Sequence, residues 1–110
     1  RYTVRETETR VMIEEEMDED GYFRNDAGYA YLFDVPSESP GDDEADGARS
    51  RLVVYEDGVP LGPPHAGHED IRKVGGGRFS HWKDKVYFST SDNTNPNVNG
   101  RRYTVRISKQ

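Results

Sequence analysis

The sequence has 110 residues, a net charge of −6 and no cysteine, and 33% of its residues are charged. Its length fits one domain, and the missing cysteines exclude disulfides and thiolate metal sites. The charge is divided unevenly, because residues 1–50 carry 15 acidic and 5 basic groups while residues 51–110 carry 6 acidic and 10 basic groups. The acidic first half argues against a nucleic-acid partner, since phosphate binding requires a basic surface.

No apolar run approaches the roughly 20 residues that a membrane-spanning helix needs, so we expect no membrane partner. A composition without cysteine fits a cytoplasmic location. The chain begins with Arg1 rather than Met, and we expect it to be part of a longer protein.

Alternating polar and apolar residues predict strands at 1–5 and 10–14. The acidic run at 14–20 is typical of a solvated loop or turn. Residues 21–35 are rich in aromatic side chains and predict two strands, with a turn at 25–28 between them. The first third of the chain is therefore predicted to form short strands joined by polar turns.

Residues 36–50 combine turn-forming and acidic side chains with nothing to bury, and we expect a mobile acidic loop there. The remaining predicted elements are strands at 51–55, 59–61, 85–90 and 102–108, one or two helical turns within 65–74, and a polar loop at 91–100. These elements predict a single all-β domain over residues 1–110. Its architecture is an antiparallel β-sandwich or small barrel, with long polar loops and at most one short helical segment.

The segment from Arg1 to Arg5 recurs identically from Arg102 to Arg106. One interpretation is a parent protein with tandem copies, in which this chain spans one repeat and the first strand of the next. The other, which we favour, is that two similar edge strands occupy equivalent places in one domain, because Tyr-Thr-Val is generic strand sequence.

Two patterns resemble metal-binding motifs but depart from them. His65, His68 and His81 are close in sequence, yet Gly67 argues against a firm helix that would align the first two. The segment 95–100 mimics the start of a calcium loop, but it lacks the first carboxylate, and Arg rather than Glu follows at the twelfth position. We expect no metal and no cofactor.

No arrangement of residues predicts nucleophilic catalysis. Ser80 precedes His81, but neighbours in sequence rarely face each other, and no nucleophile-elbow motif is present. The acidic side chains gather in loops that look too mobile to hold catalytic geometry. We therefore expect no catalytic residue and no enzyme activity.

The stretch 75–103 contains the single tryptophan and many short polar side chains around the strand at 85–90. Sugars need this mixture, because their C–H faces stack on aromatic rings while their hydroxyls pair with polar groups. The predicted ligand-binding residues are Trp82, His81, Arg78, Tyr87, Asp92 and Asn93. In the alternative interpretation, Trp82 and His81 belong to the core, and Arg78 ties loops together.

Segments 55–65, 75–82, 87–93 and 99–103 resemble a small β-rich accessory module appended to bacterial glycosyltransferases and methyltransferases of surface-polysaccharide synthesis. The Gly-Gly-Gly-Arg-Phe-Ser-His-Trp element at 75–82 is its distinctive part. The resemblance implies a non-catalytic module beside the catalytic domain of a larger cytoplasmic enzyme. We predict that the module binds carbohydrate. The alternative is a structural or protein-interaction domain that positions a catalytic neighbour or drives oligomerisation.

Overall fold

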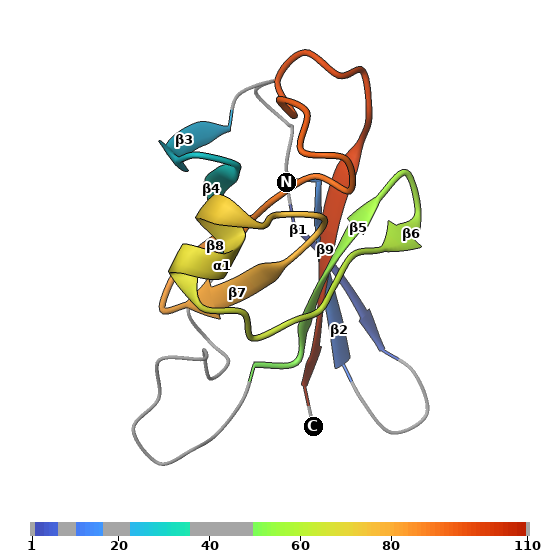
Figure 1. The fold of residues 1–110 in the computed structure, drawn as a ribbon. Helices are drawn as coiled ribbons and strands as arrows, with labels where there is room; N and C mark the ends of the chain where they lie inside the picture. Colours follow the sequence, from blue (N-terminus) through green and yellow to red (C-terminus); the bar gives the residue numbers. More distant parts are fainter. Residues whose placement is uncertain (1, 7–10, 17–22, 36–49, 110) are drawn as a thin grey trace.

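The computed structural model describes residues 2–6, 11–16, 23–35 and 50–109. These residues form nine strands and one short helix, and the strands make two antiparallel sheets (Figure 1). The expected small, antiparallel all-β fold with one helical segment is therefore confirmed. In the part of the chain that is described, no helix is long and apolar enough to cross a membrane.

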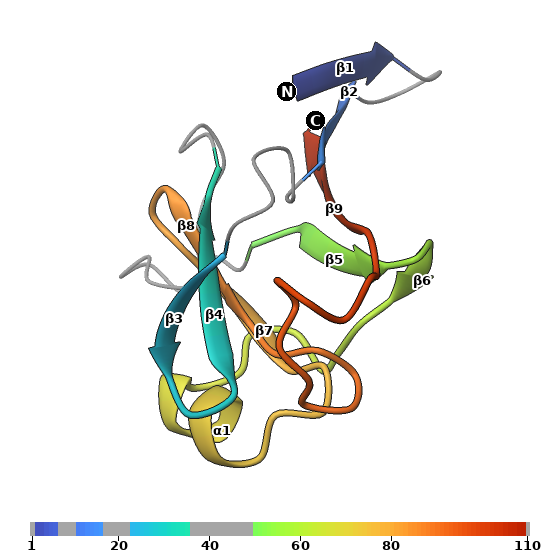
Figure 2. The ribbon, with the colours of Figure 1, turned by 90° about the horizontal axis from the view of Figure 1, so that it is seen from above.

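The strand order is β1-β2-β9-β5-β6 in the five-stranded sheet and β3-β4-β8-β7 in the four-stranded sheet. The first sheet contains β1 (Tyr2–Glu6), β2 (Val11–Glu16), β5 (Leu52–Glu56), β6 (Val59–Pro60) and β9 (Tyr103–Lys109). The second contains β3 (Arg24–Ala27), β4 (Ala30–Asp34), β7 (Phe79–Trp82) and β8 (Lys85–Phe88). Helix α1 (His68–Lys73) lies beside β4 and β8 on the outer face of the four-stranded sheet (Figures 1 and 2).

The sequence analysis did not anticipate β7 as a strand. This strand pairs with β8 through a tight hairpin, in which Trp82 lies opposite Lys85. Lys83 in that turn has a φ of 56°, a conformation that Gly or Asn adopts more readily. The turn therefore carries no recognisable sequence signal. The Asp57-Gly58 turn between β5 and β6 was predicted, and both of its residues have positive φ.

Two predicted segments lie largely outside the described residues. They are the acidic run at 14–20, of which residues 14–16 belong to β2, and the acidic loop at 36–50. Ser50, the last residue of that predicted loop, is described and is buried. The end of the segment is therefore part of the packed domain.

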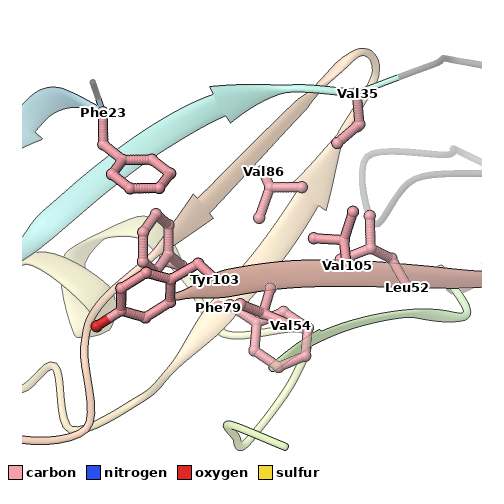
Figure 3. Close-up of a cluster of buried hydrophobic side chains, with 9 residues drawn as sticks. Phe23, Val35, Leu52, Val54, Phe79, Val86, Tyr103 and Val105 are labelled. Carbon is pink, nitrogen blue, oxygen red and sulfur yellow. The ribbon is translucent and has the colours of Figure 1, made fainter. Parts of the chain in front are cut away.

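The core lies between the two sheets (Figure 3). Three aromatic rings connect them: Phe23 before β3, Phe88 in β8 and Tyr103 in β9. The ring centroids of Phe23 and Phe88 are 5.4 Å apart, and those of Phe23 and Tyr103 are 5.7 Å apart, both in edge-to-face orientation. The whole buried cluster comprises Phe23, Val35, Leu52, Val54, Phe79, Val86, Phe88, Tyr103 and Val105. Aromatic contacts thus compensate for a sequence that is poor in aliphatic residues.

The two copies of Arg-Tyr-Thr-Val-Arg lie in the same sheet. Strands β1 and β9 flank β2, and each pairs with it antiparallel. Strand β1 is at the edge of the sheet, whereas β9 is interior and contributes the buried side chains Tyr103 and Val105. The second copy therefore completes the core of this domain, and it is not an edge strand.

A buried carboxylate fixes the long polar segment between β8 and β9. Glu56, at the end of β5, is 8% exposed. It accepts hydrogen bonds from Tyr103 Oη at 2.6 Å and from Ser91 Oγ at 2.6 Å, and Arg101 Nη1 lies 3.4 Å away. Burial raises the pKa of Glu56, but the hydrogen bonds from Ser91 and Tyr103 outweigh it, so the pKa lies below its ordinary value. The charged carboxylate therefore joins two strands of one sheet to the loop.

We expect Tyr103→Phe to destabilise the domain without enlarging any cavity. The variant removes one hydrogen bond to a buried carboxylate, and such bonds contribute about 1.5–3 kcal/mol to the free energy of unfolding. Urea denaturation of the wild type and the variant measures the difference. Tyr29→Phe is the matched control, because Tyr29 is 41% exposed. Equal unfolding free energies for Tyr103→Phe and the wild type would contradict a stabilising role for this bond.

Candidate functional site

The candidate site lies on the outer face of the four-stranded sheet. Phe79 belongs to the core between the two sheets, and successive residues of a strand point to opposite faces, so Ser80 and Trp82 lie on the outer side of β7. Across the ladder, Ser80 pairs with Tyr87 and Trp82 pairs with Lys85. Trp82 is 41% exposed, which rules out the alternative that places it in the core.

An aromatic cluster forms around Trp82. The ring of His68, the first residue of α1, has its centroid 4.7 Å from that of Trp82 and 4.3 Å from that of Tyr87. Burial lowers the pKa of His68, and the nearby positive charge of Arg72 lowers it further. The imidazole is therefore neutral at neutral pH and packs as an aromatic ring. Through His68, the contact connects Trp82 and Tyr87, the two aromatic residues among those predicted to bind a ligand.

A row of charged side chains continues from Trp82 across the sheet. Lys85 Nζ lies 2.9 Å from Asp34 Oδ1, and Arg24 Nη2 lies 2.7 Å from the same oxygen. Lys85 is paired with both Trp82 and Asp34 across its neighbouring strands. The hydrogen bond from Lys85, with a contribution from Arg24, holds the pKa of Asp34 below its ordinary value. We call Trp82, Lys85, Asp34 and Arg24 the outer row.

Three members of the outer row, Lys85, Asp34 and Arg24, are not among the predicted ligand-binding residues. Alternation along β4 and β8 assigns Asp34 and Lys85 each to one face of a sheet. It does not show which strand lies next to β4 or β8 in that sheet. Asp34 and Lys85 are 51 residues apart and meet only because β4 pairs with β8. No local signal in the sequence reports that pairing.

His81, which was predicted to bind a ligand, lies on the opposite face of β7 from Trp82. His81 has no exposed surface and points into the sandwich from β7. Its Nε2 donates to the carbonyl oxygen of Lys83 at 2.9 Å, and its Nδ1 lies 2.6 Å from Ser50 Oγ. Strand alternation is the physical reason, because a residue next to an outward Trp82 must face inward.

Arg78 and Asn93 stabilise the glycine-rich turn before β7. Asn93 Oδ1 accepts a hydrogen bond from the backbone N–H of Gly76 at 2.7 Å, and its Nδ2 donates to the carbonyl of Val74 at 3.3 Å. Arg78 Nη1 donates to the carbonyl of Gly75 at 3.0 Å. A side chain at Gly75, where φ is 67°, would collide with the Asn93 amide. These two predicted binding residues therefore shape a turn.

Asp92 is likewise engaged within the protein. Both of its carboxylate oxygens accept from Arg101, at 2.8 and 2.9 Å, and Thr94 Oγ1 donates to it at 2.7 Å. The hydrogen bonds from Arg101 and Thr94 hold the pKa of Asp92 far below its ordinary value. The structure thus separates Asp92 from the aromatic cluster and gives it a structural partner.

The alternating asparagines that mimic a calcium loop cap backbone groups. The side-chain oxygens of Asn95, Asn97 and Asn99 accept from the backbone N–H groups of Asn97, Phe23 and Arg101, respectively. These bonds are typical of asparagine in turns. In the described part of the chain, no three or more histidine, aspartate or glutamate side chains gather in a way that could hold a metal ion.

Comparison of this chain with protein-family models, with curated proteins and with solved structures found no match.

We expect Asn93→Ala to lower the free energy of unfolding by about 0.5–1.5 kcal/mol, because the exposed hydrogen bonds of Asn93 to Gly76 and Val74 are replaced by water. Thermal melting followed by circular dichroism measures this loss. Val98→Ala is the control in the same segment, since Val98 is 79% exposed. If Asn93→Ala melts at the wild-type temperature, the amide does not hold the turn.

We also expect His68 to make stability depend on pH. Its pKa is lower in the folded state than its ordinary value of 6.5, so the unfolded chain takes up a proton first. The stabilisation is present above pH 6.5 and is lost as the pH falls through the folded pKa. Urea denaturation at a series of pH values should show a steeper loss for the wild type than for His68→Phe, which keeps a ring that does not titrate. Parallel curves would contradict this role.

Proposed function

We propose that this domain is a non-catalytic module that binds carbohydrate on the outer row. The observation that carries the proposal is the exposure of Trp82 beside a line of ion-paired side chains. A large aromatic side chain in a domain of this composition would ordinarily enter the core. Here it lies on the surface, next to groups that donate and accept hydrogen bonds.

The aromatic cluster gives Trp82 the properties of a stacking platform. His68 contacts both Trp82 and Tyr87, so the indole is supported from the side of α1. A ring that is already held in place loses little side-chain entropy when a ligand binds. The C–H face of a sugar can then replace water on the exposed part of the indole.

The charged members of the outer row supply hydrogen bonds for sugar hydroxyls. Asp34 offers carboxylate acceptors, whereas Lys85 and Arg24 offer charged donors. Neighbouring hydroxyls of a sugar can each pair with one of these groups. Adjacent strands are spaced about 4.8 Å apart, so the row from β7 through β8 to β4 spans roughly 10 Å. This arrangement suits a saccharide that lies across the strands.

The broader setting comes from the resemblance to the accessory module of surface-polysaccharide enzymes. A neighbouring catalytic domain, a bacterial origin and a cytoplasmic location are parts of this proposal. So are the absence of catalytic residues and of nucleic-acid and membrane partners. A module that holds the glycan product or acceptor would raise its local concentration at the catalytic domain.

The second candidate is a protein-interaction surface at the same place. Exposed tryptophan is among the residues that most often dominate the binding energy of protein interfaces. Strand β7 is at one edge of the four-stranded sheet as described, but the backbone of Phe79 is already paired there with Pro63 and Ala66, so this candidate depends on Trp82 and not on strand addition. The two candidates differ in what binds Trp82.

Titration with a panel of purified oligosaccharides, followed by calorimetry and amide chemical shifts, tests the proposal. We expect wild-type binding, a loss of about tenfold or more in Trp82→Ala and a smaller loss in Trp82→Phe, because stacking contributes roughly 1.4 kcal/mol or more. Tyr29→Ala is the matched control, since Tyr29 and Trp82 are both 41% exposed.

Retention of wild-type affinity in Trp82→Ala would contradict the platform. If no oligosaccharide perturbs Trp82 fluorescence or the amides of the outer row, carbohydrate binding is excluded and the protein-interaction candidate is favoured.

A further inference from the structure

Two buried polar atoms among the described residues have no hydrogen-bond partner: Nε2 of His68 and Oγ of Ser80. Folded proteins pair nearly all of their buried polar groups, so an exception requires an explanation. Ser80 has no exposed surface at all. Its hydroxyl therefore lacks a hydrogen-bond partner in the unliganded domain, and solvent cannot reach it to supply one.

Both atoms lie beside the platform. Ser80 is directly opposite Tyr87 in the β7–β8 ladder and two residues before Trp82, on the same face. The His68 ring contacts both of these aromatic neighbours. The ring therefore packs on the same face of the sheet as Ser80, against two of its neighbours. Two unpaired polar atoms and an exposed indole thus occupy one small area of the outer face.

His68 can move more easily than the rest of α1. It is the first residue of the helix, and Gly67 before it provides no side-chain cap. The anchors of the helix lie further along, where Ile71 is fully buried and Arg72 Nε lies 2.6 Å from Asp26 Oδ2. A ligand can reach Ser80 only when the side chains above it turn aside, and these anchors would keep the helix in place during such a movement.

We propose that His68 Nε2 and Ser80 Oγ form a polar subsite for the acetamido group of a sugar that stacks on Trp82. This inference rests on the proposed carbohydrate-binding function and specifies its ligand as an N-acetylated sugar. An amide supplies one N–H donor and one carbonyl acceptor. A serine hydroxyl can donate or accept, and a neutral imidazole nitrogen does either according to its tautomer.

The surroundings of the subsite favour an acetamido group over a hydroxyl. The amide is planar and ends in a methyl group, so it can pack against the rings of Tyr87 and Trp82 while its polar atoms pair. A hydroxyl at the same position would supply no apolar surface to these rings. The subsite therefore discriminates by apolar contact as well as by hydrogen bonding.

The test uses two trisaccharides, N,N′,N″-triacetylchitotriose (called chitotriose below) and cellotriose, which share one backbone linkage and differ in carrying acetamido or hydroxyl groups. Calorimetry with the wild type should show chitotriose binding about tenfold or more tightly than cellotriose. In Ser80→Ala this preference should fall by about threefold or more, and part of it should remain because the acetamido methyl group still packs against Tyr87 and Trp82. The same variant should melt at or above the wild-type temperature, because it removes an unsatisfied buried hydroxyl.

A gain or no change in stability together with a loss of preference is a combination that a purely structural Ser80 would not produce. His68→Phe is the second variant, since it keeps the aromatic contacts and removes Nε2, and it should also lose part of the preference.

Equal affinity of the wild type for both trisaccharides would overturn this inference and leave the carbohydrate-binding function standing. Retention of the full preference in Ser80→Ala, or a lower melting temperature for that variant, would also overturn it. Failure of every oligosaccharide to bind the wild type would overturn the proposed function, and the subsite with it.

Discussion

Alternation along the β7–β8 hairpin is the constraint on which the surface chemistry of this domain depends. Because neighbouring residues of a strand face opposite ways, the burial of His81 and the exposure of Trp82 are a single structural fact. A slip of one residue in the pairing would exchange the two faces, placing the indole inside and the imidazole outside. The packing of Val86 and Phe88 against the core prevents that slip, so core formation determines which residues can meet a ligand.

The long polar segment before β9 shows a different use of polar side chains. A segment without regular secondary structure must satisfy its backbone groups by other means, and here short side chains do so. Asn95, Asn97 and Asn99 accept from backbone N–H groups, and Asp92 is held by Arg101. The polar side chains of this segment are therefore committed to folding, and the exposed aromatic and charged groups lie on the four-stranded sheet instead.

The sequence was sufficient to predict the fold class, because turn signals and two-residue periodicity are local. It also named Trp82 and Tyr87 among the predicted ligand-binding residues, because both are aromatic and lie in the polar stretch 75–103. It could not predict the ion pair between Lys85 and Asp34, which depends on the pairing of two strands distant in sequence. The sequence also does not show which face of β7 points into the core. Without that information, His81 and Trp82 were both predicted to be ligand-binding residues.

Two energetically unfavourable features lie close together on the outer face of the four-stranded sheet: the exposed indole of Trp82 and the unpaired hydroxyl of Ser80. An exposed indole is unfavourable because apolar surface contacts water, and an unpaired buried hydroxyl is unfavourable because it has lost water without gaining a partner. Natural domains tolerate such local conflicts mainly where function requires them. One ligand with an apolar face and an adjacent donor and acceptor would relieve both conflicts at Trp82 and Ser80. An N-acetylated sugar has this combination, whereas a purely apolar partner would cover the indole and leave the hydroxyl of Ser80 unpaired.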